Sequence, residues 1–343
     1  MRFLPNLNST RRTILLSTWG LFTGLALLLV TAGVYSTLVG IRAELKQLPT
    51  LVSGGITTAY YAGFLLGSWY TLRALKQVGH IRVYAALASL LSASVLITGV
   101  YDSPIVWILM RSSTGFCFAG LYVVAESWLN GLATNTFRGR LLAMYNVVTI
   151  GAYGAGQLLV FNFDARTLTG FAFAAVVSSL AVIPVVMSEQ AATPNVDNHT
   201  HITMRELAKI VPTGAGTILL VGLAHGGMLG MAVIYATREG LGVGRVGILI
   251  AAINLGGMAL TWPISSASDD LDRRIIGVLS TLAVIVLGLV MLTQTPSSWF
   301  TTALLFAIGG FSFPLYAVGG AYTNDWVSQE QMGAAASQLV TLY

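Results

Sequence analysis

Residues 105–131 read IVWILMRSSTGFCFAGLYVVAESWLNG and contain only two ionisable side chains, Arg111 and Glu126. The run is long enough to cross a bilayer, because about 20 apolar residues in a helix span the ~30 Å hydrocarbon core. It is too long and too continuous for a membrane barrel strand, which needs about 10 alternating residues. A helix also satisfies its own backbone hydrogen bonds in lipid. The run therefore predicts a transmembrane helix.

Similar apolar runs fill most of the chain. Of 343 residues, 55% are hydrophobic and 9% are charged, whereas a soluble domain has about 25% charged residues. This composition excludes a soluble globular domain and a disordered chain, and it predicts an all-α polytopic membrane protein. The predicted spans are 14–39, 50–72, 83–100, 105–131, 141–161, 168–188, 210–236, 244–267, 275–293 and 298–322, and an eleventh run begins near Met332 and continues to Tyr343.

The distribution of Lys and Arg predicts the orientation. With the N-terminus inside, twelve of the 18 basic residues fall in inside connectors, five fall in outside connectors, and Arg111 lies within a span. This bias places the N-terminus in the cytoplasm. Arg11 and Arg12 could belong to a twin-arginine export signal, but the apolar run behind them exceeds the ~7–15 residues of a signal sequence. We therefore predict a first transmembrane helix. The bases form no continuous face, so the net charge of +5 does not indicate nucleic-acid binding.

The chain divides at its longest polar stretch. We predict an N-terminal six-helix bundle at 1–188, a cytoplasmic linker at 189–209 and an incomplete C-terminal bundle at 210–343. His199 and His201 in the linker could bind a metal, but no Cys or carboxylate cluster accompanies them, so a solvated linker is favoured.

The two halves repeat a pattern. Trp69 and Trp262 lie 193 residues apart, and each precedes a basic inside turn by ten residues. A shared offset on both sides of a central linker indicates a duplication, as in transporters built from two parallel halves.

A group of motifs on spans four and five then points to a family. They are Arg111-x-x-x-Gly115, Val123-Val124-Ala125-Glu126-Ser127-Trp128, Arg138-Gly139-Arg140-Leu141, and Gly151, Gly154, Gly156 and Gln157. With these residues the chain resembles the major facilitator superfamily (MFS) of secondary transporters, in particular its YcaD-like bacterial branch. The resemblance implies two pseudo-symmetric six-helix bundles and a span-four arginine at a central cavity.

The sequence departs from the family pattern in two places. The signature loop between spans two and three normally reads Gly-x-x-x-Asp-Arg-x-Gly-Arg-Lys. Here only Gly79 and scattered bases remain, and Lys76 occupies the acidic position. The second-half copy keeps Asp269 but has Asp272 in place of the glycine. The family also has twelve spans, so we expect this chain to be a C-terminally truncated form with 10–11 of them.

Ionisable and polar residues at membrane depth are the candidate site residues, because each charge costs at least ~2.5–3.5 kcal/mol on insertion scales. Arg111 is interpreted as an anchor for an anionic substrate or as a group that tunes a proton-binding carboxylate. The alternative is an arginine that snorkels to the outer interface. His225 is either a packed core residue or a proton carrier. The substrate and cavity candidates are Arg111, Gly115, Tyr122, His225, Asn254 and Tyr35.

Glu126 lies near the cytoplasmic end of span four, too far from Arg111 to touch it. The favoured interpretation is a gate ion pair with a basic residue of the facing inside loops. A proton-titrating coupling site and an exposed interfacial acid are the alternatives. The gate and coupling candidates are Glu126, Arg73, Lys76, Arg82, Arg138, Arg140, Asp269, Arg273 and Arg274. Gly151, Gly154, Gly156 and Gln157 on span five are predicted to serve helix packing.

These patterns favour a secondary transporter that moves a small solute by alternating access, with proton coupling and with efflux slightly favoured over uptake. We expect a monomer in the bacterial inner membrane that binds a small-molecule substrate and protons, without a cofactor, a metal or nucleic acid. The chain contains no Walker loop, no HExxH motif and no paired acids at depth, so we predict no catalytic residue and no enzyme activity. A non-transporting scaffold or degenerate fragment is the alternative, and a membrane-embedded enzyme is the least favoured.

Overall fold

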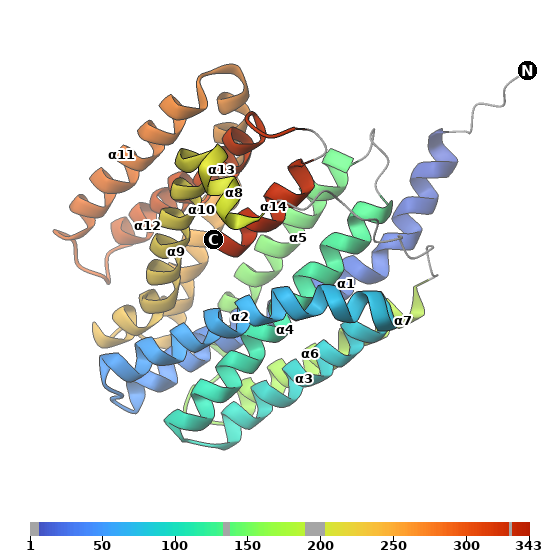
Figure 1. Cartoon of the computed structure of the whole chain (residues 1–343). Coiled ribbons are helices and arrows are strands. Elements are labelled where there is room, and N and C mark those ends of the chain that lie inside the picture. Colours follow the sequence, from blue (N-terminus) through green and yellow to red (C-terminus); the bar gives the residue numbers. More distant parts are fainter. Residues whose placement is uncertain (1–6, 133–137, 189–202, 329–330) are drawn as a thin grey trace, which may run out of the picture. The chain divides into compact units, whose positions relative to one another are not determined.

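The computed structural model describes residues 7–132, 138–188, 203–328 and 331–343 (Figure 1). These ranges contain helices and connecting turns and no β-strand. The helices are α1 (Leu7–Leu45), α2 (Thr50–Val78), α3 (His80–Val100), α4 (Pro104–Leu132), α5 (Arg138–Leu159), η1 (Val160–Asn162), α6 (Thr169–Leu180), α7 (Val182–Met187), α8 (Met204–Ile210), α9 (Pro212–Arg238), α10 (Val243–Asp270), α11 (Arg273–Met291), α12 (Trp299–Ser312), α13 (Pro314–Asn324) and α14 (Met332–Leu342). The predicted all-α class is confirmed.

Eight helical segments in the described ranges are long and apolar enough to cross a membrane. The remaining two full-length runs also form helices, but they are less apolar. Helix α2 covers the predicted run 50–72 and continues to Val78, and helix α5 contributes a shorter apolar stretch, Val147–Asn162. These two less apolar helices carry many of the tyrosines discussed below.

Two of the predicted runs are interrupted near a proline. The run 298–322 is divided into α12 and α13, and Pro314 is the first residue of α13, as expected of a residue that cannot continue the preceding helix. The run 168–188 is divided in the same way into α6 and α7, with Pro184 in the first turn of α7. The second interruption was not predicted, although the same chemistry explains it.

The chain separates into two compact units, Met1–Val196 and Asp197–Tyr343. The division falls inside the predicted linker. The last part of that linker is helical, which the sequence interpretation missed, because Thr203 and Glu206 form a capping box that starts α8. The Glu206 carboxylate accepts a hydrogen bond from the Thr203 backbone N–H at 2.8 Å, and the Thr203 hydroxyl accepts one from the Glu206 N–H at 3.3 Å.

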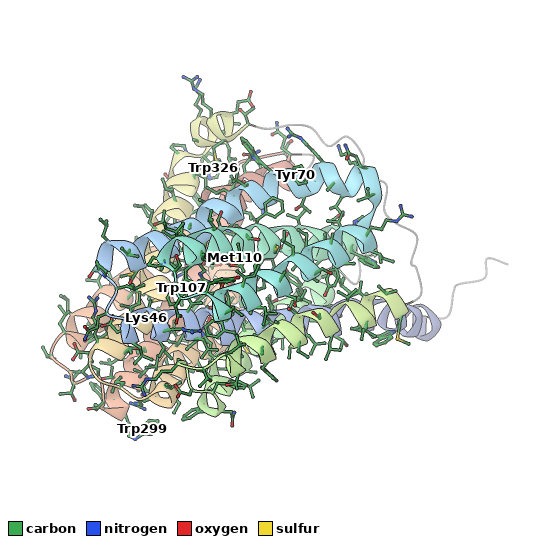
Figure 2. All side chains as sticks on the ribbon, turned by 90° about the horizontal axis from the view of Figure 1, so that it is seen from below. Lys46, Tyr70, Trp107, Met110, Trp299 and Trp326 are labelled. Carbon is green, nitrogen blue, oxygen red and sulfur yellow. The ribbon has the colours of Figure 1, made fainter. Side chains whose placement is uncertain are left out.

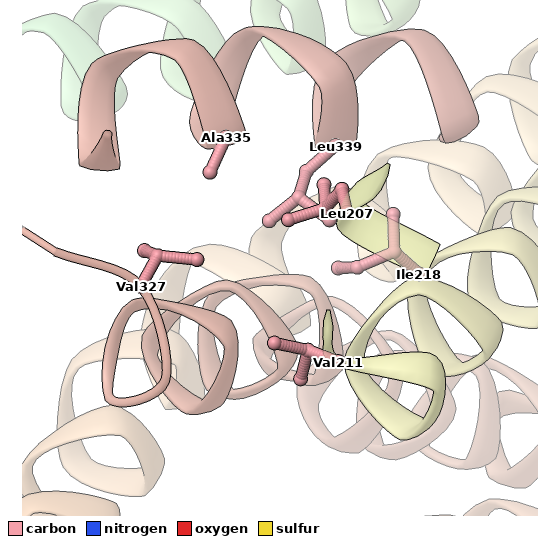
Figure 3. Packing of buried hydrophobic residues seen from close by; sticks show 6 residues of the cluster. All are labelled: Leu207, Val211, Ile218, Val327, Ala335 and Leu339. Atoms are coloured by element: carbon pink, nitrogen blue, oxygen red, sulfur yellow. The ribbon is translucent and has the colours of Figure 1, made fainter. Parts of the chain in front are cut away.

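Helix α8 is anchored in the core of the second unit rather than left in solvent. Its Leu207 is fully buried and packs in a cluster formed by α8, α9, α14 and the segment after α13 (Figure 3). The members of this cluster are Leu207, Val211, Ile218, Val327, Ala335 and Leu339. The linker therefore ends at a fixed point on the second unit.

Close backbone contact between α2 and α4 holds the first unit together. A Cβ added at Gly63 of α2 would lie 1.9 Å from the carbonyl oxygen of Ser112 on α4. In the opposite direction, a Cβ at Gly115 would lie 2.0 Å from the carbonyl oxygen of Tyr60 on α2. Only glycine permits this approach, which is the usual way in which membrane helices pack closely. Gly115 thus serves helix packing, a role that the sequence did not predict for it, and its place at a cavity stays a prediction.

The same pair of contacts recurs in the second unit between α10 and α12. A Cβ at Gly256 would meet the carbonyl oxygen of Phe306 at 1.8 Å, and a Cβ at Gly309 would meet that of Ile253 at 1.9 Å. Gly63 and Gly256 lie 193 residues apart, the offset that also separates Trp69 from Trp262. Both of these tryptophans are exposed, at 71% and 79%. The predicted pseudo-symmetry of the two halves is confirmed.

Span five makes only one of its three predicted glycine crossings. A Cβ at Gly156 would lie 2.3 Å from the carbonyl oxygen of Val30 on α1, whereas a Cβ at Gly151 or Gly154 would meet no described atom within 4 Å. A packing role for Gly151 and Gly154 stays a prediction. Gln157, the next residue, is 1% exposed and lies at the same α1–α5 crossing.

Candidate functional site

A cationic side chain in the N-terminal half of α4 lies over two aromatic rings. The guanidinium carbon of Arg111 is 4.7 Å from the centroid of the Tyr60 ring on α2 and 5.2 Å from that of the Tyr35 ring on α1. Its Nε atom is buried and has no hydrogen-bond partner among the described residues. No ion pair found in the described ranges includes Arg111. The stack holds the charge against α1 and α2, which favours the anchor interpretation over snorkelling.

Further aromatic side chains continue from this stack along α2 and α4. The Tyr60 ring lies 5.3 Å from that of Tyr61 and 6.2 Å from that of Phe64, and Phe64 in turn lies 6.2 Å from Tyr122 on α4. All four rings keep part of their surface exposed within the first unit. We call this set, with Arg111, Tyr35 and Tyr153, the Arg111 cluster: Tyr35, Tyr60, Tyr61, Phe64, Arg111, Tyr122 and Tyr153.

Helices α1 and α5 supply polar groups at the edge of the cluster. The Tyr153 hydroxyl on α5 forms a 3.0 Å hydrogen bond with the hydroxyl of Ser36 on α1, the residue that follows Tyr35. Tyr35 is fully buried, with its hydroxyl 3.1 Å from the Thr98 hydroxyl. Tyr35 is therefore the buried ring under Arg111, whereas the side chain of Tyr122 is partly exposed. Sequence reasoning did not single out Tyr153, because nothing in the sequence relates its depth to that of Tyr60.

Glu126 on α4 contacts α5 and is not part of the Arg111 cluster. The Tyr145 hydroxyl on α5 donates a 3.2 Å hydrogen bond to its Oε1 atom. No ion pair among the described side chains joins Glu126 to Arg73, Lys76 or Arg82, all of which are exposed. The side chains of the other predicted partners, Arg138 and Arg140, lie outside the described residues. The gate pair stays a prediction, and the observed role of Glu126 is to link α4 to α5.

A second charged cluster, which the sequence interpretation missed, lies where the end of α1 meets the turn between α3 and α4. Arg42 of α1 is 6% exposed and pairs with Asp102, between α3 and α4, at 2.9 Å. It also donates a 3.0 Å hydrogen bond to the Gly99 carbonyl, and its guanidinium carbon lies 5.1 Å from the centroid of the Phe171 ring on α6. Lys46 (labelled in Figure 2) pairs with the other Asp102 oxygen at 2.9 Å. Asp102 thus joins α1 to the α3–α4 turn.

Replacing Asp102 by asparagine is expected to lower the free energy of unfolding by about 1–3 kcal/mol, because Arg42 would be left as a buried charge without its counter-ion. Lys46→Met serves as the matched control. Lys46 is half-exposed, so losing its ion pair should cost less than about 1 kcal/mol. Thermal unfolding of the purified variants in detergent measures both. Equal shifts in the two variants would show that Arg42 does not depend on Asp102.

The second unit places His225 inside its packing. His225 on α9 is 3% exposed, and its Nδ1 atom lies 2.6 Å from the Tyr343 hydroxyl. Its Nε2 atom forms a hydrogen bond with the Ser312 hydroxyl of α12, and its ring stacks on Phe313 at 4.8 Å. Both ring nitrogens are engaged, which favours the packing interpretation over the proton carrier.

The remaining polar candidate in the second unit is also committed to contacts within it. Asn254 is 5% exposed and donates a 2.9 Å hydrogen bond to the Ile250 carbonyl of its own helix α10. The matching contacts of Gly115 with Tyr60 and of Gly309 with Ile253 make Ile253 the equivalent of Tyr60 in the repeat. Leu305 is then the equivalent of Arg111, because each lies four residues before its glycine. The second unit therefore carries apolar residues where the first carries the stacked cation. The described residues contain no group of three or more His, Cys, Asp or Glu side chains that could hold a metal.

Comparison with known proteins gives the same architecture. The chain is 27% identical over 327 residues to a protein of Escherichia fergusonii described as an uncharacterized MFS-type transporter, YcaD, covering 94% of this chain and 84% of the relative. The YcaD protein of Escherichia coli O45:K1 is 26% identical over 329 residues, with the same coverage of both chains. No established family profile matches the chain.

Solved structures share the fold at low sequence identity. A variant of the nucleoside transporter NupG aligns with a TM-score of 0.80 at 12% identity, over 95% of this chain and 87% of that one. The D-xylose-proton symporter aligns with a TM-score of 0.71 at 14% identity, over 98% of this chain and 87% of that one. The chain has the major facilitator fold and resembles the YcaD-type members. It is a multi-pass membrane protein, and the relatives that define its likeness are transporters rather than enzymes.

The α2–α3 loop and the α10–α11 loop, which correspond to the family's signature loop, are built differently from each other in this chain. In the first unit, Gly79 has a left-handed φ of 84°, which favours glycine, and it separates α2 from α3. In the second unit, Asp272 caps α11 by accepting a 2.8 Å hydrogen bond from the Arg274 N–H. Arg273 pairs at 2.8 Å with Asp325 after α13. Asp325 was not predicted, and the side chain of Asp269 lies outside the described residues.

The other predicted gate residue of this loop binds a tyrosine. The Arg274 guanidinium donates a 2.7 Å hydrogen bond to the Tyr322 hydroxyl on α13, and its carbon lies 5.3 Å from the centroid of the same ring. Arg273 and Arg274 therefore both connect the start of α11 to the end of α13. Because these contacts lie within the second unit, they fix the geometry of that loop.

Proposed function

We propose that this protein is a secondary active transporter that moves a small organic solute across the bacterial cytoplasmic membrane by alternating access. The observation that carries the proposal is Arg111, a charge within a membrane span that is stacked on two rings and has no counter-ion among the described residues. Keeping such a charge at depth is costly, so it requires a functional reason. The repeated glycine crossings and the likeness to transporters support the same conclusion.

The finer parts of the proposal follow from the sequence. The Lys and Arg bias supports a cytoplasmic N-terminus, and the absence of a Walker loop in the sequence supports energy from an ion gradient, most simply protons. The named relatives support this assignment, since one of the similar solved structures is a proton symporter. We propose a monomer, with efflux as the direction of transport.

Reconstitution into proteoliposomes tests this function. The purified protein should move at least one member of a solute panel faster than protein-free liposomes do, and an internal pH-sensitive dye should report proton movement coupled to that solute. A chain that moves neither solute nor protons for every member of the panel would instead support the non-transporting scaffold.

Glu126→Gln is expected to shift the balance between outward-open and inward-open states while leaving folding intact. Glutamine keeps an oxygen that can accept the Tyr145 hydrogen bond, but it loses the charge that a gate pair needs. A cysteine at Tyr61, in a chain where the buried Cys117 is replaced by alanine, reports the balance through its rate of reaction with a membrane-impermeant thiol reagent. The rate should rise from one side and fall from the other. Unchanged rates on both sides would remove Glu126 from the gate.

A further inference from the structure

The charge of the Arg111 cluster is one-sided. Its described members contain one cation and no acid. Two acids of the first unit are engaged elsewhere: Asp102 pairs with Arg42 and Lys46, and Glu126 accepts a hydrogen bond from Tyr145. Glu126 lies 15 residues from Arg111 on the same helix, which is about 22 Å at 1.5 Å per residue. An anion at Arg111 would therefore meet a guanidinium that forms no ion pair with the described residues of the first unit.

The guanidinium is also short of hydrogen-bond acceptors. Its Nε atom is buried with no partner among the described residues, and its two close neighbours are ring faces rather than oxygens. A planar guanidinium presents a fork of N–H donors that matches the paired oxygens of a carboxylate, sulfonate or phosphate group. A ligand that bears such a group would supply acceptors that the described side chains do not.

The surroundings of the charge select for a flat ligand. Tyr60 stacks on Arg111, and its ring contacts Tyr61 and Phe64, which extends the aromatic surface away from the charge. Tyr61 is 38% exposed and the other two rings are partly exposed. Aromatic pairs gain energy beyond their buried area when rings are offset or edge-on, at separations of about 4.5–7 Å. A ring attached closely to the anionic group would reach this surface.

The second unit does not repeat the stacked cation at the equivalent positions. The glycine contacts align Ile253 with Tyr60 and Leu305 with Arg111, and both are buried apolar residues. At these equivalent positions, only the first unit presents a charge. We propose that the transported solute is a small organic anion, whose charged group binds Arg111 and whose planar ring stacks on Tyr60, Tyr61 and Phe64. This inference rests on the proposed transport function.

Equilibrium binding to the purified full-length protein tests the inference with four probes. Benzenesulfonate carries both the charge and the ring, cyclohexanesulfonate lacks the flat ring, benzenesulfonamide lacks the charge, and benzyltrimethylammonium reverses it. Isothermal titration calorimetry in detergent, corrected with protein-free micelles, should give benzenesulfonate the highest affinity. We expect at least 10-fold weaker binding of the neutral and cationic probes and about 3-fold weaker binding of cyclohexanesulfonate.

Variants assign the two parts of the preference to residues. Arg111→Lys should weaken benzenesulfonate at least 10-fold and leave benzenesulfonamide unchanged. Tyr60→Leu should remove the preference for the flat ring, whereas Tyr60→Phe should keep it. Tyr70→Leu, on the same helix but outside the cluster, is the matched control and should bind all four probes like the unmodified protein. Because the probe series is measured on the unmodified chain, a variant that fails to fold does not weaken the test.

The inference is overturned if benzenesulfonamide or benzyltrimethylammonium binds as tightly as benzenesulfonate, or if benzenesulfonate does not bind at 10 mM. It is also overturned if Arg111→Lys and Tyr60→Leu both bind benzenesulfonate with the affinity of the unmodified protein. Flux measurements separate this failure from that of the proposed function. Movement of a neutral solute that benzenesulfonate does not inhibit would leave transport intact and reject the anion. Specific binding of benzenesulfonate without any flux would support the ligand class and reject transport.

Discussion

Replacing Gly63 by alanine is expected to lower the thermal stability of the protein by several degrees. The added Cβ would lie 1.9 Å from the Ser112 carbonyl oxygen, which is backbone and cannot rotate away. Helices α2 and α4 would have to separate, and overpacking of this kind costs about 1–3 kcal/mol and occasionally more. The loss would also shift Tyr60 relative to Arg111, because both residues lie beside the same crossing. Unfolding monitored by size-exclusion chromatography after heating measures the effect.

Gly55→Ala is the matched control on the same helix. A Cβ at Gly55 would meet no described atom within 4 Å, and alanine favours a helix over glycine by up to about 1 kcal/mol. The control should therefore be unchanged or more stable, so the two substitutions act in opposite directions. Gly256→Ala should be as harmful as Gly63→Ala, because the repeat places a carbonyl oxygen at 1.8 Å. Equal midpoints for Gly63→Ala and Gly55→Ala would contradict the close crossing.

Arg111→Lys is expected to keep the fold and to lose transport by at least about 10-fold. Lysine retains the charge, but its ammonium cannot present a planar fork or stack on the Tyr35 and Tyr60 rings as a guanidinium does. Initial rates of flux in proteoliposomes, for a solute that the unmodified protein moves, give the size of the loss. The thermal midpoint should change little, because no described ion pair depends on Arg111.

Arg245→Lys is the matched control, because Arg245 also stacks on an aromatic ring but lies in the second unit. Arg245, at the start of α10, has its guanidinium carbon 4.2 Å from the centroid of the Trp299 ring, and it also donates to the Ser298 carbonyl at 2.7 Å. It lies outside the Arg111 cluster, so Arg245→Lys should retain transport. Full activity of Arg111→Lys would reduce Arg111 to an interfacial anchor.

The helices could be predicted from the sequence because lipid leaves few alternatives. A long apolar run must satisfy its backbone internally, so the run around Arg111 is a helix wherever it packs. The repeat was also visible, through the shared offset of Trp69 and Trp262. Helix α8 was missed because its Thr203–Glu206 capping box lies in a polar stretch, although those two residues form a recognisable signal.

Partners across helices could not be predicted, because their positions depend on how the helices cross. The sequence placed Arg111 and Tyr35 among the candidates, but it gave no sign that the Tyr60 ring would also contact the guanidinium. Arg42 was counted only as a base of an outside connector, because its partner Asp102 lies 60 residues away in the sequence. Gly115 was assigned to a cavity because its face of α4 is polar, whereas its lack of a side chain serves the crossing with α2.

Access to the Arg111 cluster from both sides of the membrane is the most direct test of alternating access. A single cysteine at Tyr61, with Cys117 replaced by alanine, is treated with a membrane-impermeant thiol reagent in right-side-out and inside-out vesicles. We predict modification from each side, with the two rates changing in opposite directions between the unmodified Glu126 and Glu126→Gln. Modification from one side alone, or rates that rise and fall together, would contradict the account.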